Sequence, residues 1–228
     1  MIYFPRQKLS EKPLFFNWEA PVDPALIGKI SLVLAIVATL PYMFRVYQRE
    51  ITPPFVSWVV WSAIGVALLF TFKSSGAKDN MWPAVVGCVA PIIITCLVYW
   101  KSNRTLPEDH WERIITLGCA VLAALSLVAW VFVHDDKILV TWALILAIVA
   151  DACALVPTFI AYVRRPQEDR PFAWMCFGVA YGISAFAAKE NTVVNWVLPL
   201  YMLFGACAIS APLVIYRVRN KIPISEWI

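Results

Sequence analysis

Residues 29–49 read KISLVLAIVATLPYMFRVYQR, and residues 145–165 read ILAIVADACALVPTFIAYVRR. Each stretch is an apolar run with one proline in its second half, Pro41 or Pro157, and with arginine at its end. The two prolines lie 116 residues apart. Long segments that match at one fixed offset are typical of an internal repeat.

The repeat extends beyond these two stretches. The same offset aligns residues 29–101 with residues 145–217 without a gap, and 12 of the 73 aligned positions are identical. The identities include residue types that are scarce in membrane spans. They pair Pro41 with Pro157, Arg49 with Arg165, Trp58 with Trp174, Lys73 with Lys189 and Pro83 with Pro199. This coincidence favours a duplication over a chance similarity between apolar segments.

The composition of the chain is typical of a membrane protein. Of its 228 residues, 61% are hydrophobic and 15% are charged, and the mean hydropathy is +0.71. A soluble domain of this length has too little interior to bury so many apolar residues. A transmembrane helix needs about 20 mostly apolar residues. Apolar runs between charged or proline-rich breaks predict seven spans, near residues 26–47, 54–72, 81–100, 112–133, 138–163, 171–188 and 192–216.

The predicted fold is an all-α membrane protein with seven transmembrane helices. Each repeat holds three helices, an odd number, so an additional helix is needed to keep the two repeats parallel. We therefore expect two parallel three-helix bundles joined by a linker helix, a 3+1+3 arrangement. The expected segments are an N-terminal surface tail (1–25), the first repeat (26–101), the linker helix (108–135), the second repeat (138–217) and a C-terminal tail (218–228).

The distribution of lysine and arginine predicts the orientation. The loops after the first, third and fifth spans, together with the C-terminal tail, hold eleven basic residues, against four or five on the opposite side. Because cytoplasmic loops are enriched in these residues, we expect the N-terminus outside and the C-terminus in the cytoplasm. In the N-terminal tail, Phe15, Phe16 and Trp18 predict contact with the membrane surface, with a loosely ordered tail as the alternative.

The layout resembles that of the SWEET sugar transporters, the PQ-loop proteins and the bacterial nicotinamide riboside transporters. The similarity covers residues 26–217 and rests on a proline late in the first helix of each repeat, a basic loop and an aromatic-rich second helix. These features lie at Pro41 and Trp58 in the first repeat and at Pro157 and Trp174 in the second. The chain looks most like uncharacterised bacterial PQ-loop-type proteins, which implies a transporter in the bacterial inner membrane. Neither proline is followed by glutamine, so the defining dipeptide is absent.

Asp151 is the sharpest candidate for a functional residue. It lies near the middle of the fifth predicted span, and its counterpart in the first repeat is Ala35. A charge at this depth costs ~2.5–3.5 kcal/mol on insertion scales. We expect Asp151 to bind a proton or a substrate in a central cavity; the alternative is a side chain that only bonds to a neighbouring helix. Thr158, seven residues further along, shares its helix face and is expected to line the same cavity.

Pro41 and Pro157 are predicted hinges. Each removes a backbone donor inside a helix and frees a carbonyl group, at matched positions shortly before a basic loop. A hinge in each repeat would permit alternate opening of the two bundles. The alternative is a static kink.

Four more residues are candidates for binding a substrate. Trp58 and Trp174 occupy equivalent positions, where they are expected either to line a cavity or to anchor their helices at the membrane interface. Tyr181 and Asn195 are polar groups in the second repeat, which either bond to a ligand or pack helices together.

These residues favour a transporter of a small polar solute, with or without coupling to protons. The alternatives are a structural or assembly subunit of a larger membrane complex and a membrane receptor. No convergent catalytic constellation indicates an enzyme, and no cofactor or metal site is expected, because the cysteines lack CxxC spacing and His134, Asp135 and Asp136 are adjacent in sequence. The expected partners are the lipid bilayer, the solute, a proton, and copies of the chain or a larger complex. No basic block indicates nucleic acid.

Overall fold

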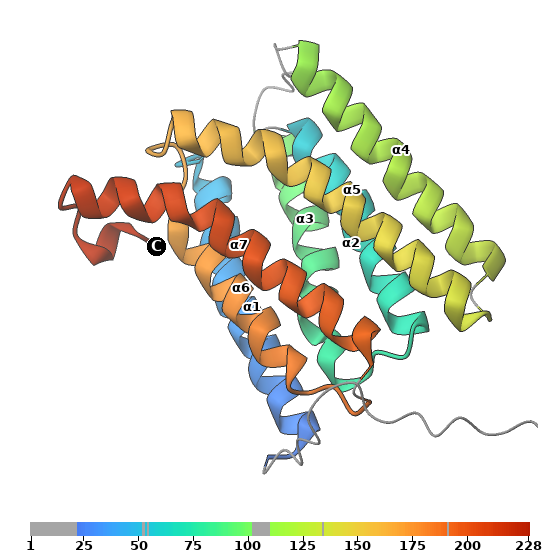
Figure 1. Ribbon diagram of the computed structural model, residues 1–228. Helices are drawn as coiled ribbons and strands as arrows, with labels where there is room; N and C mark the ends of the chain where they lie inside the picture. Colours follow the sequence, from blue (N-terminus) through green and yellow to red (C-terminus); the bar gives the residue numbers. More distant parts are fainter. Residues whose placement is uncertain (1–21, 52, 54, 102–109, 134, 191) are drawn as a thin grey trace, which may run out of the picture.

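The computed structural model describes residues 22–228 apart from positions 52, 54, 102–109, 134 and 191, and the described residues form helices and no strand (Figure 1). The α-helices are α1 (Pro24–Gln48), α2 (Phe55–Ser74), α3 (Trp82–Lys101), α4 (His110–Val133), α5 (Lys137–Arg164), α6 (Pro171–Ala185) and α7 (Val193–Arg219). Short 3-10 helices lie at Asp79–Met81 (η1) and Ile224–Glu226 (η2). The predicted tail contact at Phe15, Phe16 and Trp18 lies outside the described residues.

Local capping signals explain where several helices begin and end. The Asp23 carboxylate accepts a bond from the Ala25 amide, and Pro24 occupies the first helical position of α1. Asp136 caps α5 in the same way. The last residue of the sequence 134–136 is therefore a helix cap. Arg49 adopts a left-handed conformation, with φ of 64°, and ends α1.

The helices have the length and the apolar composition that the prediction of a membrane protein requires. Six helices in the described part of the chain, all except α6, are long and apolar enough to cross a membrane. Large apolar side chains such as Val33, Phe132 and Phe204 are exposed on the outer surface, as in a protein surrounded by lipid. The span expected at 171–188 is shorter than predicted, because α6 has 15 residues and ends at Ala185.

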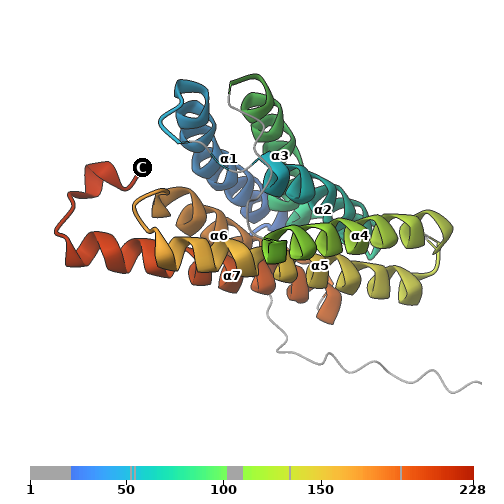
Figure 2. The same ribbon diagram turned by 90° about the horizontal axis from the view of Figure 1, so that it is seen from above.

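The helices pack in a recurring set of pairs. Within residues 24–101, α3 lies against both α1 and α2, and within residues 137–219, α7 lies against both α5 and α6. The two sets meet where α1 packs on α6 and where α2 packs on α5. α4 lies at the edge of the bundle, against α2 and α5, and consecutive helices run in alternating directions (Figures 1 and 2).

A glycine makes the close approach of α2 and α3 feasible. A Cβ atom at Gly65 would lie 2.6 Å from the Gly87 carbonyl oxygen and 3.1 Å from the Cys88 Cα. Both are backbone atoms, which cannot move aside as a side chain can. Gly118 in α4 is the opposite case, since a Cβ there meets nothing within 4 Å.

We expect Gly65→Ala to lower the free energy of unfolding by about 1–3 kcal/mol, because overpacking forces two helices apart. Gly118→Ala is the matched control, and it should be neutral or stabilising by about 0.5–1 kcal/mol, since alanine favours a helix interior. Denaturation midpoints of the purified variants in detergent measure both effects. Equal midpoints for the two variants would contradict the close approach.

Candidate functional site

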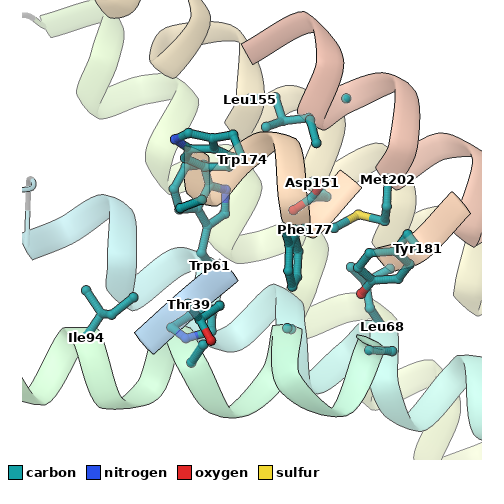
Figure 3. A pocket seen from close by; sticks show the side chains of 18 of the residues that line it. Thr39, Trp61, Leu68, Ile94, Asp151, Leu155, Trp174, Phe177, Tyr181 and Met202 are labelled. Carbon is teal, nitrogen blue, oxygen red and sulfur yellow. The ribbon is translucent and has the colours of Figure 1, made fainter. Parts of the chain in front are cut away.

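A cavity of about 120 Å³ lies between the two sets of helices (Figure 3). Side chains or backbone of α1, α2, α3, α5, α6 and α7 line it, and α4 contributes none within the described part of the chain. Most of the lining is apolar or aromatic. The aromatic members are Tyr42, Trp58, Trp61, Trp174, Phe177 and Tyr181.

Asp151 brings a carboxylate to this cavity from α5. It is 7% exposed, and its Oδ2 accepts a hydrogen bond of 2.7 Å from the Tyr201 hydroxyl of α7. No lysine, arginine or histidine is among the lining residues that the structure describes. The wall of the cavity therefore carries one acidic group and no basic group to neutralise it.

The aromatic side chains form a continuous series that crosses from one set of helices to the other. Ring centroids lie 5.5 Å apart for Tyr42 and Trp58, 5.2 Å for Trp58 and Trp61, and 5.6 Å for Trp61 and Trp174. Tilted and edge-on arrangements of this kind are favourable for aromatic pairs. Because Trp61 belongs to α2 and Trp174 to α6, this contact joins the two sets at the cavity.

A second aromatic pair, which belongs to α6, lies beside Asp151 of α5. The Phe177 and Tyr181 ring centroids are 5.1 Å apart, and Tyr181 is fully buried. Gly87 of α3 leaves space for the pair, because a Cβ there would lie 3.0 Å from the Tyr181 hydroxyl and 3.2 Å from the ring of Phe177. Both rings line the cavity.

Four of the six predicted binding residues line the one cavity: Asp151, Trp58, Trp174 and Tyr181. Thr158 does not line it, and its hydroxyl bonds to the Ala154 carbonyl oxygen at 3.4 Å. Seven residues return a helix to almost the same face, but they also advance it by about 10 Å along the axis. On α5 the lining extends only as far as Leu155, so Thr158 lies beyond the end of the cavity.

Asn195 also lies away from the cavity, at the start of α7. Its side chain is 2% exposed, donates to the Glu190 carbonyl oxygen at 2.9 Å and accepts from the Asn80 amide at 3.4 Å. Nearby, the Lys189 ammonium lies 2.9 Å from the Asp79 carboxylate, which raises the pKa of Lys189. These contacts join η1 to the start of α7 and to the loop between α6 and α7.

The opposite end of the bundle holds a second polar cluster. Asp169 is buried in the loop between α5 and α6, where it accepts hydrogen bonds from the Tyr162 hydroxyl and from Trp174 Nε1 at 3.1 Å. Burial raises the pKa of the Asp169 carboxyl, while these bonds and the nearby Arg217 charge act in the other direction. Arg217 donates to the Asp169 carbonyl oxygen at 2.7 Å and to the Pro166 carbonyl oxygen at 3.2 Å.

The same end contains a charge contact between the first and second sets of helices. Arg170 Nη2 lies 3.9 Å from the Glu50 carboxylate, which also pairs with Arg45. Arg170 Nη1 donates to the Ile228 carbonyl oxygen at 2.5 Å, so the end of the chain packs onto this cluster. Each end of the bundle is thus crossed by polar contacts between residues from the two sets.

Pro41 and Pro157 lie inside α1 and α5, as the sequence predicted, and their role as hinges stays a prediction. Tyr201 was not among the predicted site residues. The repeat held a signal for it, because its counterpart is Val85, just as that of Asp151 is Ala35. Asp151 and Tyr201 thus both replace apolar residues of the first repeat, and they bond to each other beside the cavity.

Within the described residues, no group of three or more histidine, cysteine, aspartate or glutamate side chains is arranged to hold a metal ion. Comparison with known proteins finds no matching family model, curated protein or solved structure. The site must therefore be interpreted from its own geometry.

Proposed function

We propose that this protein is a transporter of a small solute, with a 3+1+3 arrangement in which the cavity between two parallel three-helix bundles is the solute site. The observation that carries the proposal is the cavity itself, built from both sets of helices and containing the Asp151 carboxylate. A charged group inside a membrane bundle is costly and typically marks a pathway for a substrate or proton.

The helix packing supports the 3+1+3 arrangement. The 116-residue offset makes α1, α2 and α3 the counterparts of α5, α6 and α7. When each helix is replaced by its counterpart, the contact of α1 with α6 becomes the contact of α5 with α2, and both contacts are present. The same replacement converts α1 with α3 and α2 with α3 into α5 with α7 and α6 with α7. A pseudo-twofold relation between two halves accounts for all of these pairs, with α4 as the linker.

The contacts at both ends of the cavity suggest how access would alternate. Asn80 with Asn195 and Asp79 with Lys189 join the halves at the end where α3 and α7 begin. Glu50 with Arg170 joins them at the opposite end, which we assign to the cytoplasm from its basic loops. Breaking one set while the other holds would open the cavity to one side at a time.

A reversible cross-link tests this mechanism. In a variant whose native cysteines are replaced, Asn80→Cys together with Asn195→Cys would place a disulfide between η1 and α7. We expect oxidation to stop solute flux into proteoliposomes, because the end that must open is held shut, and reduction of the same sample to restore it. Each single-cysteine variant serves as the control and should be indifferent to oxidation.

Flux that is the same in oxidised and reduced samples, with the disulfide shown to be formed, would contradict alternating access at this end. An absence of protein-dependent flux for any tested solute would instead favour a structural subunit of a membrane complex. That alternative draws support from the mainly apolar lining of the cavity. Stable co-purification with partner proteins would distinguish it.

A further inference from the structure

We propose that the cavity binds a small organic cation, an ammonium compound whose charge lies against Asp151 and whose alkyl groups lie on the surrounding aromatic rings. This assignment names the solute class of the proposed transporter and rests on that function for its physiological meaning. It depends on three independent properties of the cavity: its charge, its aromatic surface and its size.

The charge of the lining selects against anions and favours cations. Asp151 is the acidic group of the wall, and no basic side chain among the described lining residues balances it. The Tyr201 hydroxyl satisfies one carboxylate oxygen and supplies no positive charge. A buried carboxylate without a counter-charge is unfavourable, so a bound cation would supply the missing partner.

The polar groups of the lining are too few for a sugar or another polyhydroxylated solute. The Thr39 hydroxyl already donates to the Ala35 carbonyl oxygen at 3.0 Å. Among the lining residues, this leaves mainly the carboxylate, the hydroxyls of Tyr42 and Tyr181 and the indole N–H groups of Trp58 and Trp61, since Trp174 donates to Asp169. A solute with many hydroxyl groups would exchange its hydrogen bonds with water for contacts with apolar walls, at a substantial cost.

The aromatic rings suit a cation in particular. Trp61 and Trp174 contact each other in the wall of the cavity, and Phe177 with Tyr181 forms a second pair on α6 (Figure 3). The face of an aromatic ring attracts an ammonium group, and this attraction grows when the site excludes water. Purely apolar packing would need the rings but not the carboxylate. Proton binding alone would need the carboxylate but not a space with aromatic walls.

The size of the cavity limits the cation to a few atoms. Its volume of about 120 Å³ is slightly below the roughly 150 Å³ of an engineered cavity that binds benzene. A compound of roughly five to seven non-hydrogen atoms fits this scale. Tetramethylammonium and choline have this size, and they are suitable probes of the site.

Equilibrium binding to the purified protein in detergent provides the test, because it does not depend on transport. Radiolabelled choline is displaced by unlabelled tetramethylammonium or by 3,3-dimethylbutan-1-ol, the neutral compound in which carbon replaces the choline nitrogen. We expect tetramethylammonium to compete, and the neutral compound to compete at least about tenfold more weakly, since only the charge differs.

Two substitutions place the binding at this cavity. Trp61→Leu should weaken choline binding about tenfold, and Trp61→Phe should weaken it less, because a ring face is retained. Trp142→Leu is the matched control, since Trp142 is 64% exposed on the outer side of α5, and it should leave binding unchanged. Trp61→Phe also keeps the test decisive if the leucine variant does not fold.

The inference is overturned if the folded wild-type protein binds neither cation at millimolar concentration, if the neutral compound competes as well as tetramethylammonium, or if Trp61→Leu and Trp142→Leu have equal effects. Choline binding without any flux would overturn the proposed transport function and leave the cation site intact. Cross-link-sensitive flux of a neutral solute, without cation binding, would overturn the cation site and leave the transport function intact.

Discussion

Asp151→Asn is expected to reduce choline uptake into proteoliposomes to the rate of protein-free vesicles. The carboxylate is the acidic group that the described lining offers to a cation. Asparagine keeps the shape of the side chain and an oxygen that accepts the Tyr201 hydrogen bond, so the charge is lost while the packing stays. Loss of one charge-assisted contact of about 1.5–3 kcal/mol corresponds to a decrease of roughly 10- to 150-fold.

The same variant tests coupling to protons. After the solute leaves, the empty carboxylate has to be neutralised before the cavity changes sides, because an unpaired charge in an apolar space is costly. A proton can perform this role, so the wild-type protein should take up choline faster when the vesicle interior is more acidic than the medium. Asp151→Asn should show neither the uptake nor this dependence on the gradient.

Glu168→Gln is the matched control for the charge. Glu168 is an exposed acid that pairs with Arg165 in the loop before α6, and its loss should leave the uptake rate unchanged. Tyr201→Phe should have a smaller effect than Asp151→Asn, because it removes a hydrogen bond and retains the carboxylate. Uptake by Asp151→Asn at the wild-type rate would refute the assignment of this carboxylate to the solute.

Arg217→Met is expected to lower the free energy of unfolding by about 2–5 kcal/mol. Arg217 is 5% exposed, and its guanidinium donates to the carbonyl oxygens of Pro166 and Asp169. Methionine has a similar length but no donor, so both carbonyl groups of this loop would be left without their partner. Each unsatisfied buried polar group costs about 1–3 kcal/mol.

Arg219→Met provides the control, because Arg219 is exposed two residues further along the same helix. A surface substitution of this kind should change stability by less than about 0.5 kcal/mol. Chemical denaturation of both variants in the same detergent gives the comparison, and Arg217→Lys should fall between wild type and Arg217→Met. If the two methionine variants unfold at the same denaturant concentration, Arg217 does not hold the loop between α5 and α6.

The helices could be predicted from the sequence because a segment surrounded by lipid must consist of a long run of apolar residues. Apolar runs of about 20 residues stand out against short charged loops, and the ends of α1 and α5 carry visible caps at Asp23 and Asp136. The end of α6 could not be predicted in this way. The apolar run continues past Ala185, and the chain turns there through backbone hydrogen bonds at Phe186 and Ala187 that no residue type announces.

The candidate site was predictable only in part. Asp151 is visible because an acid is rare in an apolar run, and Trp58 with Trp174 because the repeat pairs them. Tyr201 could not be assigned as the partner of Asp151, because their bond joins residues 50 positions apart and depends on how α5 packs against α7. Thr158 was expected on the correct helix face, but the length of the cavity along that face is a property of the packed bundle.

The shortness of α6 affects how the protein meets its lipid. Fifteen residues make about 22 Å of helix, against a hydrocarbon layer of about 30 Å. If α6 spans the bilayer, as the proposed 3+1+3 arrangement requires, its two ends lie short of the surfaces of the hydrocarbon layer, where water cannot satisfy backbone groups. Side chains bond to these backbone groups in place of water. Arg217 donates to carbonyl groups near one end of α6, and Asn195 donates to the Glu190 carbonyl near the other end. In the proposed arrangement, these contacts inside the protein would compensate for the hydrophobic mismatch of this helix, and the surrounding bilayer would not need to become thinner there.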